Sequence, residues 1–395
     1  MNKKSILILG AGVYQVPAIQ KAKEMGLETI VLSYNIKSYP GYKYADIPLE
    51  VDTTDIKRVL RVAREYKVGG VFTTGTDVAL KALGAVNEKL GLCGPNAKAC
   101  ELSTNKSAMK RRFIQGDVPT ARYFEVRNFR ECTEAADKIG FPVMVKAVNS
   151  SGSRGISKAE NMKGLKDAWK YSKENSRNSD PVIIEEYLEG VEFGAQAFVF
   201  DGDVKLVCPH NDTVTPPPYS TPIGHSYPFE KLELLGEIRK VVTSSIEALG
   251  IDNSAANIDL ILTNDGPKIL EIGARMGATC LPELTAVYTG IDVYRECIKI
   301  SMGETPSFTQ IKNKPVAGLL LTSKKSGKVM NILAPSINAK NGTKIIKIDV
   351  SKDDPVHKFR VGPERIGEVI ALGNSYADAE REAEKVAGSI KVAVK

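Results

Sequence analysis

The sequence predicts a multidomain protein built from α/β and α+β units, and three observations lead to this fold class. The chain has 395 residues, which is too long for one simple hydrophobic core. Strand and helix patterns alternate over residues 1–95, whereas apolar strands joined by hairpin turns follow later in the chain. The content of 43% hydrophobic and 26% charged residues is typical of a globular protein.

Residues 1–95 have the pattern of a Rossmann-like domain. Residues 5–9 form an apolar strand that ends in a glycine-rich turn, and the helix pattern after it places Val16, Ile19 and Ala22 on one face. Residues 28–33 are predicted to form the second strand. The alternation continues with a helix at 56–66, a strand at 70–73 and a helix at 79–90.

The glycine-rich turn departs from the dinucleotide-binding fingerprint. The full pattern is GxGxxG, with an acidic residue at the end of the second strand. Here the turn is GAGVYQ, with Gln15 in place of the third glycine, and the second strand ends in Ser33-Tyr34-Asn35 without an acid. The turn therefore predicts a tight strand-to-helix connection that binds no dinucleotide.

The rest of the chain divides into four predicted segments. A basic helical linker at 96–118, helical over 96–115, precedes a lid unit at 119–198 and a unit at 199–303 that carries two acids. A closing α+β domain at 304–395 contains predicted strands at 317–323, 344–349 and 368–373, a helix at 376–386 and a short last strand. Residues 213–228 contain three consecutive prolines and are predicted to form a rigid loop.

Composition narrows the classes of function. The formal charge of +7 is spread along the chain without a basic block, which argues against nucleic-acid binding. The six cysteines form no CxxC pair and the three histidines lack zinc-ligand spacing, so we expect free thiols and a cytoplasmic location. No run of about 18 apolar residues occurs, so we expect no membrane partner.

A lysine and the loop after it predict a phosphate-binding flap. Lys146 lies in the apolar strand VMVKA, where a charge is costly unless it has a partner. The following loop, NSSGSRG at 149–155, offers small residues and backbone donors that can close over phosphates. It is not a Walker A loop, because no Gly-Lys-Ser/Thr ends it. The candidate contacts in the loop are Ser151, Gly152, Ser153, Arg154 and Gly155.

An acidic segment follows the next apolar strand. The strand at 182–184 continues into Glu185, Glu186, Tyr187 and Leu188, and Glu192 comes seven residues after the first of these acids. On its own this segment is more typical of a solvated acidic turn.

Two acids on neighbouring apolar strands predict a metal site. Asp259 and Glu271 lie on either side of a hairpin turn, NDGP at 264–267, so we expect them to face each other. Acids on apolar strands are costly unless a cation neutralises them, and Mg²⁺ is the natural cation for carboxylate oxygens. An acid–base pair at the surface is the alternative interpretation.

Taken together and in this order, these segments resemble the ATP-grasp superfamily over nearly the whole chain. The resemblance is closest to the branch of biotin carboxylase and the L-amino-acid ligases, in which the two metal acids have the same twelve-residue separation as Asp259 and Glu271. It implies an ATP-grasp fold with an N-terminal Rossmann-like (pre-ATP-grasp) domain. It also implies ATP and Mg²⁺, or Mn²⁺, as cofactors, and a homodimer.

The resemblance also implies roles for individual residues. Lys106 and Lys146 contact ATP phosphates, the segment from Glu185 to Leu188 reads adenine, and Glu192 binds the ribose. Arg275 stabilises the transferred phosphoryl group or holds the substrate carboxylate. In the family, the second metal acid begins the pattern Glu-x-Asn-x-Arg, whereas this chain has Gly273 at the position of the asparagine. One ligand of a second Mg²⁺ is therefore missing, and water or Asn257 could replace it.

The substrate pocket is expected between the N-terminal domain and the unit with the metal acids. Two histidines could act as general bases toward an amine, although each could equally be an ordinary pocket or surface histidine. The candidate substrate residues are Gly12, His210, Asn211, His225, Arg275 and Gly277.

The expected function is an ATP- and Mg²⁺-dependent ligase that activates a small-molecule carboxylate as an acyl phosphate and joins it to an amine. A dipeptide or an amino-acid conjugate is the expected product. Two alternatives stay open from the sequence. One is a carboxylase or purine-pathway enzyme of the same fold that uses bicarbonate or formate, and the other is a non-catalytic ATP-binding regulatory protein.

Overall fold

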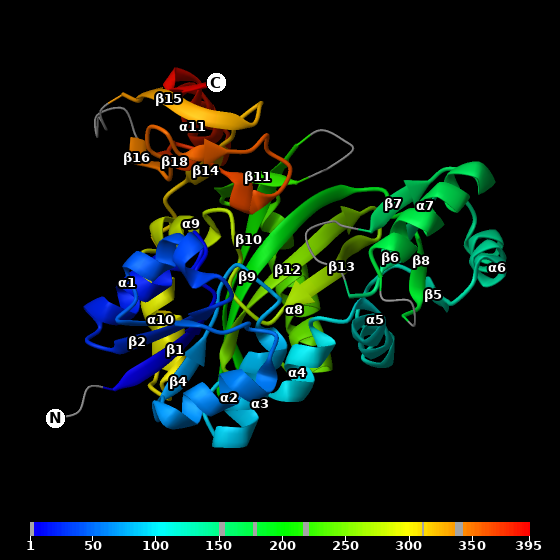
Figure 1. Cartoon of the computed structure of the whole chain (residues 1–395). Coiled ribbons are helices and arrows are strands. Elements are labelled where there is room, and N and C mark those ends of the chain that lie inside the picture. Colours follow the sequence, from blue (N-terminus) through cyan, green and yellow to red (C-terminus); the bar gives the residue numbers. More distant parts are fainter. Residues whose placement is uncertain (1–3, 150–154, 177–179, 216–220, 310–311, 336–342) are drawn as a thin grey trace.

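Four sheets organise the chain in the computed structural model, which describes residues 4–149, 155–176, 180–215, 221–309, 312–335 and 343–395 (Figure 1). The N-terminal sheet and the small sheet of residues 123–186 lie at opposite sides of a long central sheet (Figure 1). The mixture of parallel and antiparallel sheets confirms the predicted α/β and α+β fold class.

The N-terminal sheet has the order β3-β2-β1-β4, and its strands are parallel. All five residues of β1 are buried, as expected for a parallel strand with helices on both faces. The predicted alternation is confirmed, with boundaries shifted by at most one residue. The elements are β1 Ser5–Leu9, α1 Val16–Glu24, β2 Glu28–Ser33, β3 Ile47–Glu50, α2 Ile56–Glu65, β4 Gly70–Phe72 and α3 Leu80–Leu90.

The linker contains two helices where one was predicted. Helix α4 spans Ala97–Leu102 and helix α5 spans Lys106–Gln115. The break occurs because the Asn105 side chain accepts a hydrogen bond from the amide of Ala108 at 3.0 Å, which caps a new helix.

The small sheet, which corresponds to the predicted lid, has the order β5-β8-β6-β7 and antiparallel pairing. Two helices cover one of its faces, and their apolar side chains form a separate core with the sheet. The elements are β5 Tyr123–Val126, α6 Phe129–Ile139, β6 Val143–Ala147, β7 Ile156–Ala159, α7 Met162–Glu174 and β8 Val182–Glu186.

The central sheet has eight strands in the order β13-β12-β9-β10-β11-β14-β18-β16, all antiparallel to their neighbours. The predicted domain boundary at 198–199 falls inside β9, and the one at 303–304 falls between β13 and β14, which belong to this same sheet. Both boundaries stay predictions. The strands are β9 Val191–Phe200, β10 Asp203–Val214, β11 Pro222–Tyr227, β12 Ser254–Thr263, β13 Gly266–Gly273, β14 Val316–Leu321, β16 Thr343–Ile348 and β18 Gly367–Leu372.

The rigid loop predicted at 213–228 is wrong over most of its described length. Strand β10 continues to Val214, and β11 occupies Pro222–Tyr227. Pro222 is the first residue of its strand, a position where a missing amide hydrogen is tolerated. The three prolines lie outside the described residues.

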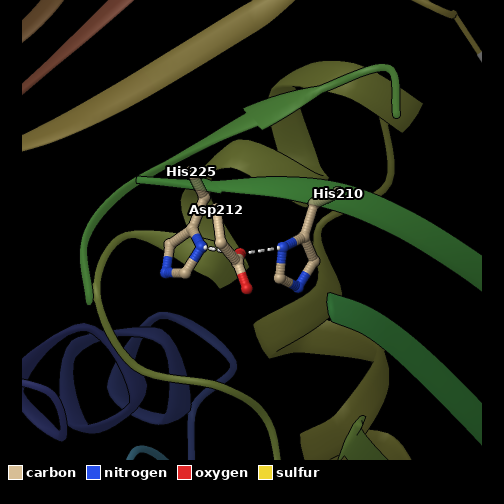
Figure 2. Close-up of side chains that lie close together, drawn as sticks. All are labelled: His210, Asp212 and His225. Atoms are coloured by element: carbon tan, nitrogen blue, oxygen red, sulfur yellow. Dashed lines mark hydrogen bonds and ion pairs between the residues drawn. The ribbon is translucent and has the colours of Figure 1, made fainter. Parts of the chain in front are cut away.

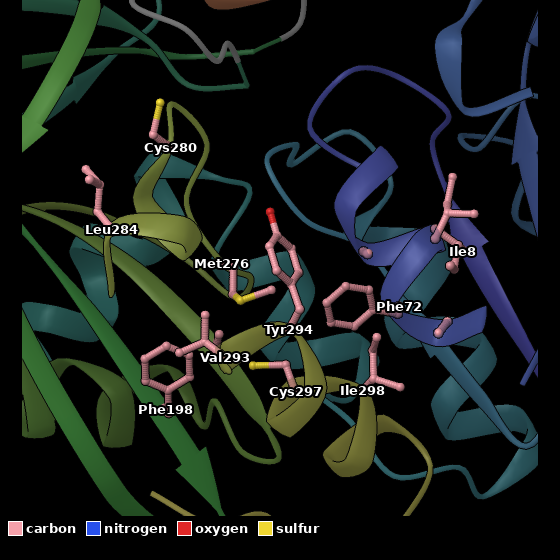
Figure 3. Close-up of a cluster of buried hydrophobic side chains, with 14 of the residues drawn as sticks. Ile8, Phe72, Phe198, Met276, Cys280, Leu284, Val293, Tyr294, Cys297 and Ile298 are labelled. Carbon is pink, nitrogen blue, oxygen red and sulfur yellow. The ribbon is translucent and has the colours of Figure 1, made fainter. Parts of the chain in front are cut away.

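Helices on both faces fix the central sheet in place. Helix α8, Leu235–Leu249, packs on one face, and α9, Leu281–Thr289, and α10, Val293–Ser301, pack between the other face and the N-terminal sheet. Figure 3 shows this second interface, where Phe72 of the N-terminal sheet and Phe198 of the central sheet lie on either side of α10 residues. Beside this interface, Val13 and Tyr14 of the glycine-rich turn line one recess together with Gly277 and Ala278, which follow β13.

The C-terminal part adds a three-stranded sheet, β17-β15-β19, and a helix packed on the central sheet. The predicted strands and helix are confirmed, although the helix runs three residues further and both β15 and β17 were missed. The elements are β15 Gly327–Leu333, β17 Pro355–Val356, α11 Tyr376–Ser389 and β19 Lys391–Val394. None of the helices in the described segments is long and apolar enough to cross a membrane.

A buried ion-pair network joins the linker to the small sheet. Glu185 of β8 is 1% exposed and bonds Lys110 of α5 at 2.9 Å and Lys146 of β6. Burial raises the pKa of Glu185, but the two lysines outweigh it and lower the pKa to about 2. Because a free glutamate has a pKa of 4.5, this stabilisation is complete above pH 4.5 and is lost as the pH falls toward 2.

We predict that Glu185→Gln destabilises the protein at pH 7 by roughly 3–5 kcal/mol, because it leaves two buried lysines without their anion. The free energy of unfolding, measured in urea from pH 7 to pH 3, should fall less steeply in this variant than in the parent. The control is Glu125→Gln, whose partly exposed pair with Arg111 contributes about 1 kcal/mol or less. Coinciding stability profiles for the parent and Glu185→Gln would contradict the assignment.

Candidate active site

The strand register of the central sheet aligns charged side chains across one face. Glu271 pairs with Asp259, Asp259 with Gly194, and Gly194 with His210. Since side chains two residues apart on a strand share a face, Asp212 lies beside His210, and it pairs with His225 of β11. We call the five charged or ionisable residues the polar row: Glu271, Asp259, His210, Asp212 and His225.

Two of the three acids of the polar row fit a divalent cation. Asp259 and Glu271 are direct cross-strand partners, as predicted. Burial, and then the charge of Glu271, raises the pKa of Asp259 to about 7. A cation between the two carboxylates would relieve both effects, and Mg²⁺ prefers such oxygen ligands.

The two residues considered for a further metal ligand are Asn257 and Gly273, and neither presents an unbonded side-chain oxygen in this structure. The amide oxygen of Asn257 accepts a hydrogen bond from Gln196 at 2.7 Å, and its nitrogen donates to Asp259 at 3.3 Å. At Gly273, an added Cβ would lie 2.8 Å from Oδ1 of Asp77, so a carboxylate from the N-terminal domain fills the space of the missing side chain.

The predicted phosphate lysines reach acids of the site from two other elements. Lys106, the first residue of α5, bonds Oε1 of Glu271 at 2.7 Å, and Lys146 of β6 bonds Glu185. Gly155 has φ +68°, and an added Cβ would lie 2.7 Å from Ala147, so the end of the predicted flap requires glycine. Ser151, Gly152, Ser153 and Arg154 lie outside the described residues.

The predicted adenine and ribose residues are spread over the connection from β8 to β9. Glu186 bonds Arg122 at 2.7 Å, and Lys158 lies 3.9 Å above the Tyr187 ring. Glu192 is exposed on β9, on the same face as Gly194 and therefore as the polar row. Leu188 lies half-buried between these positions. Their roles toward a nucleotide stay predictions.

The two histidines of the polar row share one acid (Figure 2). Oδ1 of Asp212 lies 2.8 Å from Nδ1 of His210 and 2.6 Å from Nδ1 of His225. A carboxylate only accepts hydrogen bonds, so each Nδ1 is assigned the hydrogen and each Nε2 keeps its lone pair. Burial lowers the pKa of His225, which favours the neutral base at pH 7.

His210 points its second nitrogen across a gap in the row. Nε2 of His210 is buried and has no hydrogen-bond partner among the described residues. An added Cβ at Gly194 would lie 2.6 Å from this nitrogen, so only glycine at 194 leaves room for the ring next to Asp259. The sequence pattern missed Asp212, although a His-x-Asp spacing on a strand places both side chains on one face.

The remaining substrate candidates divide by their contacts. Gly277 donates its amide hydrogen to Gln196 at 2.8 Å, which ties the segment after β13 to the central sheet. The amide of Gly12 donates to the Gln15 side chain at 2.8 Å, so the turn residue that breaks the dinucleotide fingerprint caps the turn itself. Asn211 faces away from the polar row, and its side chain bonds Ser226, Pro228 and Glu230.

A buried recess adjoins Gly277 where three parts of the chain meet. Arg365 and Glu368 form an ion pair there, and Arg365 lies 5.2 Å from the centre of the Tyr14 ring. The sequence pattern gave no signal for these residues, because they come from the two ends of the chain. The recess is lined by Tyr14, Gly277, Cys280, Glu283, Arg365 and Glu368.

Arg275 meets the N-terminal domain directly. Its Nε and Nη2 donate to the two carboxylate oxygens of Asp77, each at 2.8 Å. Burial alone would lower the pKa of Arg275, but Asp77, and then Asp259 and Glu271, raise it. The predicted catalytic arginine therefore lies within the field of both metal acids.

Comparison with known proteins identifies the family and the fold of the chain. Residues 104–213 match the family described as phosphoribosylglycinamide synthetase, ATP-grasp (A) domain, and residues 319–395 match L-amino acid ligase C-terminal domain 2. The crystal structure of phosphoribosylglycinamide synthetase from Anaerococcus prevotii is 30% identical, with 100% of both chains covered and a TM-score of 0.85.

Two further relatives differ in how much of the chain they cover. L-amino acid ligase from Bacillus licheniformis has the same fold, with a TM-score of 0.84 over 100% of both chains at 18% identity. Formate-dependent phosphoribosylglycinamide formyltransferase from Prochlorococcus marinus is 30% identical over 47% of this chain and 48% of its own length. The chain thus spans about half the length of that relative. It belongs to the ATP-grasp family of ATP-dependent carboxylate–amine ligases, for which ATP and Mg²⁺ are the usual cofactors.

Proposed function

We propose that this ligase joins the carboxylate of one small molecule to the amine of another and forms a dipeptide or an amino-acid conjugate. The polar row carries the proposal, because one sheet face holds both halves of the chemistry. Its acids Asp259 and Glu271 can hold Mg²⁺, which would in turn bind nucleotide phosphates. Its histidines can accept the proton that an amine loses. Gly194 is the boundary between the halves.

The acid half would activate the carboxylate. Mg²⁺, when bound by Asp259 and Glu271, supplies charge neutralisation at the transferred phosphoryl group. Lys106 and Lys146 lie on the linker and the small sheet, so both can turn from their acidic partners to phosphate oxygens as these two elements close on the nucleotide. Arg275 adds a planar fork that suits a carboxylate or a phosphoryl group.

The histidine half would deprotonate the amine. Asp212 fixes the tautomer of both rings, so that Nε2 of each can accept a proton from an incoming ammonium group. Attack of the neutral amine on the acyl phosphate then forms the amide, and phosphate leaves. The same three side chains could instead hold a metal ion, since their ligand atoms lie within 4.8 Å of one another.

Two observations favour an amino-acid product over a purine-pathway one. Residues 319–395 match the L-amino acid ligase C-terminal domain, and the Gly12 amide is already bonded to Gln15 and is not directed at a substrate phosphate. The 30% identity to phosphoribosylglycinamide synthetase favours the purine-pathway alternative, with formate or bicarbonate as the acid. The homodimer and the cytoplasmic location expected from the sequence remain predictions.

The proposal is tested by ADP release from Mg²⁺-ATP with amino acids supplied singly and in pairs, and by mass spectrometry of the products. We expect one acid–amine pair to drive turnover and to yield their summed mass minus water. Turnover driven only by formate or bicarbonate would establish the purine-type or carboxylase alternative. ATP binding without turnover on any acid would indicate a regulatory protein.

We predict that Glu271→Gln lowers ATP turnover by roughly a thousandfold, since a metal ion supplies several kcal/mol of charge stabilisation. Removal of Mg²⁺ with EDTA should have the same effect on the parent enzyme. Glu247→Gln, an exposed change on α8, serves as the control and should leave turnover unchanged. Near-normal activity of a folded Glu271→Gln variant would exclude the metal assignment.

We predict that Asp212→Asn separates the two half-reactions. Trapping with hydroxylamine, a strong nucleophile, should still yield hydroxamate from the acid and ATP, because acyl phosphate formation needs only the acid half. Amide formation should fall by roughly 10²–10⁴-fold, the usual contribution of a general base. The control is Asp203→Asn, an exposed change on the same strand. If both reactions fall together, the histidines do not act on the amine alone.

A further inference from the structure

The contact between Arg275 and Asp77 has the geometry of a bound substrate carboxylate. Two parallel hydrogen bonds of 2.8 Å join the guanidinium to both carboxylate oxygens, which is the fork arrangement that arginine forms with planar anions. The Arg275 side chain is 13% exposed and that of Asp77 is 25% exposed. The pair is therefore mostly shielded from water, although one side stays open.

Backbone contacts between two segments hold Asp77 beside Arg275. The strand-like bridge between Thr74 and Met276, and the hydrogen bond from the Gly75 amide to the Met276 carbonyl at 3.1 Å, tie the segment after β4 to the segment after β13. Gly273 leaves room for the carboxylate, because any side chain there would begin 2.8 Å from Oδ1 of Asp77. The two segments and the glycine together form a seat for one carboxylate beside Arg275.

Asp77 depends on this arginine for its bonding. Among the described residues, Arg275 is the only side chain that the Asp77 carboxylate bonds. The fork also lies at the end of β13, because the Asp77 carboxylate lies against Gly273, two residues after Glu271. A carboxylate that replaced Asp77 would thus lie next to the acid half of the polar row, where activation has to occur.

We propose that Asp77 is an internal stand-in for the carboxylate of the acid substrate, which holds the Arg275 fork until the acid displaces it. The inference rests on the proposed function and adds that Arg275 receives a carboxylate, not a phosphoryl group. Asp77 is a positioning residue, because it acts through Arg275. The exchange replaces one carboxylate by another, so the buried guanidinium never loses its counter-ion.

This arrangement lowers the affinity of the protein for the acid substrate, and the effect can be measured. An acid that has to displace Asp77 binds more weakly than it would to a free fork, because part of its binding energy is used in the displacement. Removal of the Asp77 carboxylate should therefore strengthen the binding of small carboxylates. A purely structural ion pair would instead lose stability without gaining such a site.

The test is chemical rescue of Asp77→Ala by formate, followed as the melting temperature. The variant should melt several degrees below the parent, and sodium formate should restore much of the loss, whereas sodium chloride at equal ionic strength should not. Glu125→Ala is the control, since it frees the exposed Arg111, where formate should have no specific effect. Absence of a formate-specific rescue would overturn the proposal.

A phosphate titration and a second variant complete the test. Inorganic phosphate is titrated in parallel, and a rescue by phosphate but not formate would assign the fork to a phosphoryl group and overturn the proposal. If Asp77→Ala does not fold, Asp77→Asn keeps the side-chain volume, and calorimetry should show formate binding roughly tenfold tighter than to the parent. Equal affinities would overturn it. Neither arm requires ATP turnover, so a failure here is distinct from a failure of the ligase assay.

Discussion

The register of the central antiparallel sheet is the constraint on which the site depends. Four strands align Glu271, Asp259, Gly194 and His210 in one line, although these residues are far apart in the sequence. A shift of any strand by one residue would move its member to the opposite face, where α8 packs. The apolar faces of the same strands prevent such a shift, because it would expose their buried side chains. The same strand register therefore buries the apolar face of the sheet and aligns the side chains of the polar row.

A second constraint is that each cation of the site bonds an acid. Lys106 bonds Glu271, Lys146 bonds Glu185, and Arg275 bonds Asp77. Buried or half-buried charges are costly without a partner, so these pairs keep the site folded while its cations stay charged. The partners of Lys106 and Arg275 come from other parts of the chain, so an anionic ligand that takes over either cation would loosen one part from another.

The sequence allowed much of the fold to be predicted, but less of the site. Buried parallel strands such as residues 5–9 and 28–33 were predictable because their apolar runs and glycine turns are local signals. The facing of Asp259 and Glu271 was predictable because one hairpin joins them. Asp77 was not, since its partner lies 198 residues away. Local periodicity does not report such contacts, and it also missed Asn105, whose capping bond divides the linker helix.

Gly273 shows how a departure from a family pattern can be explained by a distant residue. From the sequence, this glycine removes a metal ligand and weakens the case for a second Mg²⁺. In the structure, the space of its side chain is filled by a carboxylate of the N-terminal domain, so an asparagine at 273 would collide with Asp77. The two positions are therefore sterically coupled, and neither can be interpreted alone. Gly273 leaves the space in which Asp77 of the N-terminal domain reaches Arg275. Through this contact, the N-terminal domain lies next to the predicted catalytic arginine.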